Sequence, residues 1–195
     1  MARLLKCTDP ESCAAEVAAA LARPGGVALV PTETVYGLAA RVGDEAAYAR
    51  IFELKQRSPA KVLGWFVGDW RTLGAYGVKL AGLPQRLAAR YCPGPLTVIA
   101  PLEGGGTLGF RSPDHPFLQA LLKLTGPLYQ TSANLSGRPD PKDAASALAE
   151  LTGSPDIAVD AGPLPPDARS STIVDAAGTE PKILRQGKLV IDFTI

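Results

Sequence analysis

Apolar and polar positions along this 195-residue chain follow a helical spacing in some stretches and form short apolar runs in others. Thr8–Glu11 supplies a helix cap, a proline at the first helical position and an early acid, which predicts an alanine-rich helix to about Leu21. Pro24–Gly26 ends that helix. The next run, Val27–Val30, is short, apolar and bounded by Gly and Pro, so we expect a buried strand there.

The same two patterns alternate through the rest of the chain. Apolar side chains at helical spacing predict helices near 44–54, 80–91, 117–124 and 142–151. Short apolar runs predict strands near 62–67, 96–100, 108–111, 127–130, 157–160, 172–175 and 182–185. This alternation favours an α/β or α+β fold around one sheet, and the prolines at element ends indicate a mixed sheet. We expect residues 1–195 to form a single domain.

Composition excludes several classes of protein. With 20 Lys and Arg against 19 Asp and Glu, the net charge of +1 is too small for a nucleic-acid binder that works by bulk basicity. The 46% of hydrophobic residues argues against disorder. No apolar run reaches the roughly 20 residues that span a bilayer, the first residues turn polar too soon for a signal peptide, and the three cysteines lack Cys-x-x-Cys spacing. We therefore expect a cytoplasmic protein with no membrane contact and no protein-held metal.

The charges are unevenly distributed, which changes the meaning of the near-zero total. Seven cations and one anion lie in residues 55–99, whereas two cations and eight anions lie in residues 139–180. Lys55, Arg57 and Lys61 gather where a helix should end, because Pro59 cannot continue it. Two interpretations stay open: a solvated cluster at the negative end of the helix dipole, or a site for a polyphosphate.

Small polar residues directly follow two of the expected strands. Pro31–Leu38 comes after the first strand, and Thr131–Gly137 comes after the strand near 127–130. Hydroxyl and amide groups at the carboxyl ends of strands lie where open α/β sheets bind ligands. Polar turns are the alternative interpretation of both segments. A nucleophilic role for Ser132 has little support, since no histidine or carboxylate is its neighbour in sequence.

Two further segments carry candidate ligand contacts. Gly104–Gly109 matches a dinucleotide-binding pattern, but no helix can follow it, so a Rossmann site is rejected and a flexible hairpin is expected. Arg111 precedes Ser-Pro, a restricted extended segment that would hold the guanidinium rigidly for a bidentate pair with a carboxylate. An ordinary surface ion pair is the alternative for Arg111.

In order and spacing these segments resemble the YrdC-like threonylcarbamoyl-AMP synthase family. The resemblance rests on Pro31–Leu38, Lys55-x-Arg57, Pro93–Thr97, Arg111-x-Pro113, Thr131–Gly137, Ser171–Asp175 and Ile183–Gly187, which together cover nearly the whole chain. It implies a single twisted mixed sheet flanked by helices, with a large, basic, concave cavity. It also implies that ATP, L-threonine and bicarbonate condense to L-threonylcarbamoyl-adenylate and pyrophosphate, as the first step of threonylcarbamoyladenosine formation at tRNA position 37.

The resemblance also assigns roles, residue by residue. Around threonine it places Thr34, Arg111, Thr131 and Ser171, with Arg111 pairing the carboxylate. It assigns phosphate neutralisation to Lys55, Arg57, Lys61 and Arg185, nucleotide contacts to Thr107, Ala133 and the loop near Pro141, and the phosphate or carbamoyl end to Ser132, Asn134 and Ser136. The expected catalytic residues are Lys55, Arg57, Ser132 and Asn134. Mg²⁺ would accompany the triphosphate, and tRNA or downstream threonylcarbamoyl-transfer proteins would make transient contacts.

Two other functions compete with this one. A concave basic surface also suits structured RNA, but the near-neutral charge and the lack of an aromatic-rich basic platform count against an RNA-binding module without catalysis. A carbamoyl-transfer domain of the kind fused into hydrogenase-maturation proteins would need partner domains for which this chain is too short. Within the resemblance, Gln56, Ser58 and Val62 depart from the family pattern around Lys61.

Overall fold

The computed structural model describes residues 1–194, and within them ten strands form one mixed sheet. The helices are α1 (Pro10–Leu21), α2 (Glu45–Lys55), η1 (Trp70–Tyr76, a 3₁₀ helix), α3 (Leu83–Tyr91), α4 (Pro116–Thr125) and α5 (Ala144–Glu150). The strands are β1 (Arg3–Lys6), β2 (Val27–Val30), β3 (Gly37–Arg41), β4 (Gly64–Phe66), β5 (Leu96–Pro101), β6 (Thr107–Arg111), β7 (Leu128–Ser132), β8 (Ile157–Asp160), β9 (Thr172–Asp175) and β10 (Lys182–Arg185).

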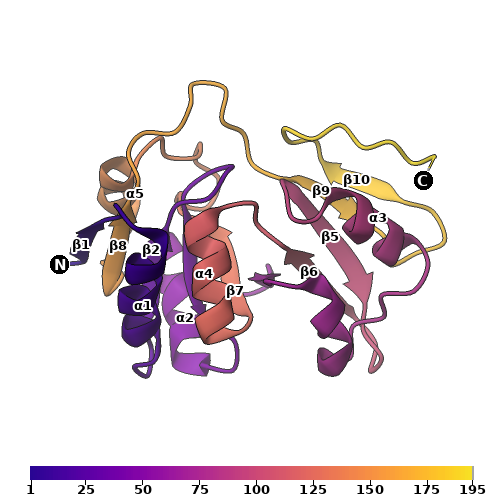
Figure 1. Ribbon diagram of the computed structural model, residues 1–195, viewed down its shortest axis with the longest axis horizontal. Coiled ribbons are helices and arrows are strands. Elements are labelled where there is room, and N and C mark those ends of the chain that lie inside the picture. Colours follow the sequence, from indigo (N-terminus) through magenta and orange to yellow (C-terminus); the bar gives the residue numbers. More distant parts are fainter. Residues whose placement is uncertain (195) are drawn as a thin grey trace.

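The order of the strands brings distant parts of the sequence side by side. Across the sheet the order is β1-β8-β2-β3-β7-β4-β6-β5-β9-β10. Neighbours pair in parallel at β1–β8, β8–β2, β4–β6 and β5–β9, and antiparallel elsewhere. In Figure 1 a long connection runs from β8 in one half of the molecule to β9 in the other. The chain segment before β9 therefore joins the two halves (Figure 1).

Helices cover both faces of the half of the sheet that contains β2 (Figure 1). α1 and α4 pack on one face in a core that includes Ala28 and Val30. α2 and α5 pack on the other face in a core that includes Val27 and Leu29. Successive side chains of a strand point to opposite faces, so β2 is apolar at every position because both its faces are buried.

The other half of the sheet has a helical core on one face and a cavity on the other. In β5, Leu96, Val98 and Ala100 pack in a core with residues of α3 and η1. The intervening Thr97 and Ile99 point to the opposite face, where they line the cavity. The alternation along one short strand thus decides which side chains meet the core and which meet the cavity.

The sequence predicted most of these elements correctly. α1 spans Pro10–Leu21 as expected, with Asp9 capping it, whereas the helix expected near 80–91 begins only at Leu83. The strand expected at 62–67 is shorter, and β1, β3 and η1 were not predicted. The expected hairpin is present, since β5 and β6 pair antiparallel on either side of the glycines at 104–106. No helix within residues 1–194 is long and apolar enough to cross a membrane.

Candidate functional site

A cavity of about 250 Å³ lies against β5, β6 and β9, and the segments that follow β2 and α2 and the end of β7 complete its walls. Eight residues singled out from the sequence line it: Thr34, Arg57, Thr107, Arg111, Thr131, Ser132, Ser171 and Arg185. They come from segments as far apart as Thr34 and Arg185, which only the strand order brings together. The cavity therefore gathers residues expected at the threonine end and residues expected at the phosphate end.

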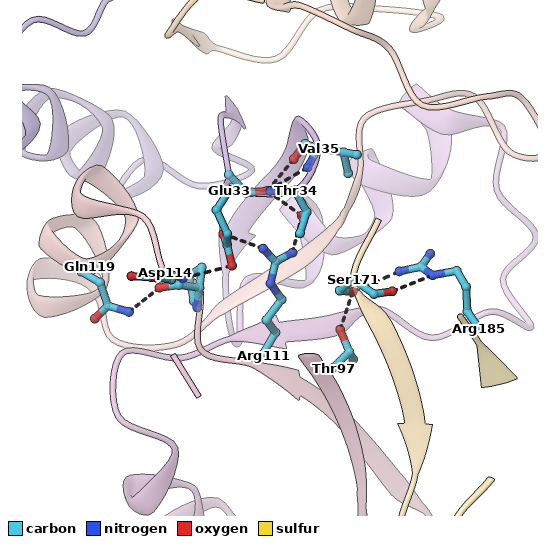
Figure 2. A network of polar contacts seen from close by, with 11 residues as sticks. Glu33, Thr34, Val35, Thr97, Arg111, Asp114, Gln119, Ser171 and Arg185 are labelled. Atoms are coloured by element: carbon cyan, nitrogen blue, oxygen red, sulfur yellow. Dashed lines mark hydrogen bonds and ion pairs between the residues drawn. The ribbon is translucent and has the colours of Figure 1, made fainter. Parts of the chain in front are cut away.

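Arg111, the last residue of β6, is the buried cation of this cavity, with 4% of its surface exposed. One terminal nitrogen, Nη1, donates to Thr34 Oγ1 over 2.8 Å, and Nη2 lies 2.6 Å from Glu33 Oε2. Glu33 is fixed in turn, because its Oε1 accepts from the Asp114 backbone N–H over 3.0 Å. Figure 2 shows Arg111 held between Glu33 and Thr34 in this way. The sequence offered a surface ion pair as the alternative for Arg111, whereas the pair in the structure is buried.

The Arg111 guanidinium keeps unused hydrogen-bonding capacity. Within residues 1–194 its buried Nε–H has no acceptor, and Nη2 contacts Glu33 without hydrogen-bond geometry. A guanidinium offers five N–H donors in a planar fork that matches a carboxylate. The position of Arg111 in the cavity wall therefore suits it to a ligand carboxylate, in addition to the Glu33 carboxylate that balances its charge.

Thr32 shapes the loop that presents Thr34. The Thr32 hydroxyl donates to the Val35 carbonyl over 2.7 Å and accepts from the backbone N–H groups of Thr34 and Val35 over 3.0 Å. The Thr32 and Thr34 hydroxyl oxygens also lie 2.8 Å apart, so the two side chains are in direct polar contact. Thr34 Oγ1 accepts from Arg111, and the loop is rigid at the point where it borders the cavity.

A second polar group lies across the cavity, on β5, on β10 and at the residue before β9. Ser171 Oγ and Thr97 Oγ1 are 2.8 Å apart, and Arg185 donates to the Ser171 carbonyl and hydroxyl over 3.0 and 3.1 Å. Figure 2 shows Ser171 between Thr97 and Arg185, facing the Arg111 group. Partial burial lowers the pKa of Arg185, a shift that Asp140 opposes. Even so, an arginine stays protonated, so Arg185 brings a permanent charge to this wall.

Arg57 approaches the cavity from the loop after α2. Its Nε donates to the Lys61 carbonyl over 3.0 Å, and its Nη2 donates to the Val62 carbonyl over 3.1 Å. Burial lowers the pKa of this guanidinium, which nevertheless remains charged. Arg57 therefore both orders the loop 58–62 and lines the cavity.

Lys55 lies outside the cavity wall, although we expected it to contact phosphate. It is the one buried lysine among residues 1–194, and its ammonium donates to the carbonyls of Ser132 and Asn134. Burial is the main cause that lowers the pKa of Lys55 to about 8, with a further contribution from Arg57. The ammonium faces backbone oxygens rather than open space, so these oxygens, and not a ligand, stabilise its charge.

Six of the expected site residues do not line the cavity: Lys55, Lys61, Ala133, Asn134, Ser136 and Pro141. Lys61 is exposed, and only its backbone takes part, as the acceptor for Arg57. Ala133 and Pro141 are buried, which leaves their expected nucleotide contacts without a side-chain basis in this structure. For Ala133 even the backbone N–H is occupied, because it donates to the Tyr36 carbonyl.

Four polar residues of the site had no role predicted from the sequence, among them Gln130, which lines the cavity. Glu33 pairs with Arg111, Thr97 pairs with Ser171, and Ser170 lines the cavity while its hydroxyl donates to Asp140 over 2.5 Å. Thr97 carried a signal, because it is the one polar position in an apolar strand. Glu33 carried one as well, as the one charged residue in Pro31–Leu38.

Gly187 provides a test of how this wall is held. A Cβ there would lie 2.1 Å from the Ser170 carbonyl oxygen and 2.5 Å from two backbone atoms of Ser171 and Thr172. We expect Gly187→Ala to lower the free energy of unfolding by about 1–3 kcal/mol, since backbone must move to admit the methyl group. Gly178→Ala is the matched control, with its nearest contact at 3.9 Å. Equal urea denaturation midpoints for the two variants would contradict this packing.

Comparisons with known proteins agree on one family. The family model Sua5_yciO_yrdC, described as "Telomere recombination", matches residues 20–187. A Mycobacterium tuberculosis protein, provisionally named a threonylcarbamoyl-AMP synthase, is 33% identical over 198 residues, which cover 96% of this chain and 91% of that protein. The threonylcarbamoyl-AMP synthase of Pyrococcus abyssi is 33% identical over 189 residues, which cover 90% of this chain and 54% of that protein.

A solved structure extends the likeness to three dimensions. The crystal structure of Pyrococcus abyssi Sua5 complexed with L-threonine matches this chain with a TM-score of 0.80 at 28% sequence identity. The match covers 97% of this chain and 58% of that one. The fold described above, one large mixed sheet flanked by helices, is therefore shared with a protein whose threonine-bound structure is known.

Proposed function

The chain belongs to the Sua5/YciO/YrdC family, and from this membership we propose that it is an L-threonylcarbamoyladenylate synthase. Relatives at about one-third identity carry the name threonylcarbamoyl-AMP synthase, so the chain is an enzyme of the nucleotidyltransferase type. Its substrates are ATP, L-threonine and bicarbonate, and its product serves the modification of tRNA at position 37.

One observation carries the proposal. Arg111, built to hold a carboxylate, and two further cations, Arg57 and Arg185, line the same cavity. A reaction between an amino acid and a nucleotide triphosphate needs a carboxylate site and a phosphate site within reach of each other. Holding two reactants in one place converts their encounter into an effectively unimolecular step.

The threonine end of the cavity is the wall around Arg111. Its guanidinium pairs the threonine carboxylate, while the hydroxyls of Thr34, Thr131 and Ser171 lie in the same lining for further hydrogen bonds. Glu33 keeps the region close to neutral when the site is empty, because its carboxylate lies 2.6 Å from the guanidinium. A zwitterionic amino acid adds no net charge, so it can enter without leaving an unpaired buried ion.

The phosphate end is the wall formed by Arg57, Arg185 and the hydroxyl of Ser132. Fixed cations and hydrogen-bond donors stabilise the charge that develops on the α-phosphate and on the departing pyrophosphate. Thr107 at the start of β6 lies in the same lining and contacts the nucleoside. Lys61 is exposed at the end of the loop that Arg57 binds, and its positive charge attracts the phosphates from the solvent side.

The chemistry balances without a protein nucleophile. The threonine amine takes up bicarbonate to form a carbamate, with loss of one water. A carbamate oxygen then attacks the α-phosphorus of ATP, and the bond to the β-phosphate breaks with release of pyrophosphate. The protein's task is to orient the carbamate and the triphosphate in line and to neutralise charge.

Mg²⁺ is expected with ATP rather than as a resident metal. Among residues 1–194 no group of three His, Cys, Asp or Glu side chains is placed to hold a metal ion. Mg²⁺ commonly keeps several waters and binds through substrate phosphates rather than in an all-protein cage. We propose that the ion enters as the ATP complex.

The proposal is tested by pyrophosphate release from the purified full chain. The protein is incubated with Mg²⁺, ATP and bicarbonate, with and without L-threonine. We expect release that depends on threonine. Release of equal size without threonine, or no release at all, would reject the assignment, and the second result is what an RNA-binding module would give.

Arg57→Ala separates the two ends of the cavity. We expect it to raise the KM for ATP by about tenfold or more, because a charge-assisted contact with a phosphate is lost, and to leave the KM for threonine within about threefold. Arg86→Ala is the matched control, since Arg86 is an exposed arginine on α3 in the same basic segment, outside the cavity. Steady-state kinetics with each substrate varied in turn measures both constants. Equal rises in both KM values would contradict this division.

A further inference from the structure

Lys55 lies behind the cavity wall and contacts Ser132, a residue of that wall. It ends α2, with 1% of its surface exposed, and it does not line the cavity. An ammonium has three N–H donors and no acceptor. In the structure these donors meet three oxygens: the carbonyls of Ser132 and Asn134, and Asn134 Oδ1 at 3.4 Å. No donor is left for a phosphate.

The three oxygens belong to the turn that follows β7. The Lys55 carbonyl also takes part, since it accepts from the Ser136 backbone N–H over 3.1 Å. Asn134 completes the turn: its Nδ2 donates to the carbonyls of Leu135 and Arg138 over 3.0 and 2.6 Å. Asn134 Oδ1 accepts from Ser132 Oγ over 2.5 Å. Both ends of Lys55, backbone and ammonium, are thus bonded to the turn.

We propose that Lys55 is a positioning residue, which holds the Ser132–Ser136 turn so that Ser132 stays in the cavity wall. The Lys55 ammonium holds Asn134 by its carbonyl, and the Asn134 side chain accepts a hydrogen bond from the Ser132 hydroxyl. The position of that hydroxyl therefore depends on Lys55. Ser132 is the member of this group that lines the cavity. Lys55 therefore acts on catalysis through Ser132 and Asn134 rather than by neutralising phosphate charge. The inference rests on the proposed function, because it concerns the orientation of groups at the phosphate end.

Two uncharged replacements distinguish positioning from charge neutralisation. Lys55→Met removes the charge and every donor, whereas Lys55→Gln removes the charge but keeps a side-chain amide that can donate to the carbonyls. We expect Lys55→Met to lower kcat by about 10- to 100-fold while the KM for ATP stays within about threefold, since a misplaced group costs rate rather than ground-state binding. We expect the kcat of Lys55→Gln to be at least about fivefold higher than that of Lys55→Met.

A double variant tests whether Lys55 acts through Ser132. If it does, the kcat of the double variant Lys55→Met/Ser132→Ala should lie within about threefold of the kcat of the more damaging single variant. If Lys55 contacts phosphate directly, the two effects multiply, the KM for ATP rises about tenfold or more in Lys55→Met, and Lys55→Gln is no better than Lys55→Met. Any one of these three results overturns the proposal.

The wild-type protein provides a measurement that does not depend on the folding of a variant. In protein labelled with ¹⁵N-lysine, the resonance of the buried Lys55 ammonium is followed while ATP is added to saturation. We expect it to move no more than that of Lys79, an exposed lysine outside the cavity. A clearly larger shift would overturn the proposal. A wild-type chain that releases no pyrophosphate with threonine would instead refute the proposed function, so the two failures are distinguishable.

Discussion

Replacing Arg111 with alanine is expected to weaken L-threonine binding by about 100-fold or more and to leave the KM for ATP within about threefold. The guanidinium is the buried cation at the end of β6, and its fork suits a carboxylate. Removing one member of a buried charged pair costs more than the contact itself, because the partner charge is left unpaired. We therefore also expect the free energy of unfolding to fall by about 1–3 kcal/mol, as Glu33 loses its cation.

Arg111→Lys separates these two consequences. A lysine keeps a positive charge beside Glu33 but lacks the planar fork, so stability should return while threonine affinity stays low. Arg71→Ala, which removes an exposed arginine paired with Asp69 outside the cavity, is the control for a general loss of charge. Isothermal titration with threonine and urea denaturation measure the two quantities. Threonine affinity in Arg111→Ala within a few-fold of wild type would contradict the assignment of the carboxylate site.

The second large effect is the pH dependence of stability caused by Lys55. Burial, together with Arg57, lowers the pKa of Lys55 from its ordinary value of 10.5 to about 8, against the opposing charges of Asp140 and Glu150. Between pH 8 and 10.5 the unfolded chain holds this proton and the folded chain has released it. Stability therefore rises with pH across this window, by about 3 kcal/mol for this one group.

Comparison with Lys55→Met isolates this contribution from other groups that titrate at alkaline pH. The difference in the free energy of unfolding, wild type minus variant, should increase by about 3 kcal/mol between pH 7.5 and 10.5. Lys79→Met, a change at an exposed lysine, is the control for the loss of a lysine charge. Urea denaturation at a series of pH values gives these differences. A wild-type curve parallel to that of Lys55→Met would show that the ammonium keeps its ordinary pKa in the folded state.

The elements of the fold were largely predictable because local patterns decide them. Val27–Val30 is apolar at every position, and the structure explains this by burial on both faces. Gly37–Arg41 was missed because Gly-Leu-Ala-Ala-Arg has little intrinsic preference for a strand. Its conformation is fixed by pairing with β2 and β7 on either side, which no local window of sequence contains.

The candidate site was predictable in its residue types more than in its contacts. Arg111 and Thr34 were both singled out, but their 2.8 Å hydrogen bond joins positions 77 residues apart. The placement of Lys55 shows the limit most clearly. A lysine at the end of a helix, followed by Arg57 and Lys61, suits a phosphate by its charge. Its charge alone does not show that the carbonyls of Ser132 and Asn134 lie beside it. That information resides in the strand order, which places β7 next to β3.

The central claim, that this chain joins threonine, bicarbonate and ATP in one cavity, is tested most directly by identifying the product. The full chain is incubated with Mg²⁺, ATP, L-threonine and ¹³C-bicarbonate, and the quenched mixture is analysed at once by mass spectrometry. The account predicts an adenylate that contains the threonine moiety and a single ¹³C, formed in a one-to-one ratio with pyrophosphate. Pyrophosphate released without that labelled adenylate, or an adenylate of threonine that carries no ¹³C, would contradict it.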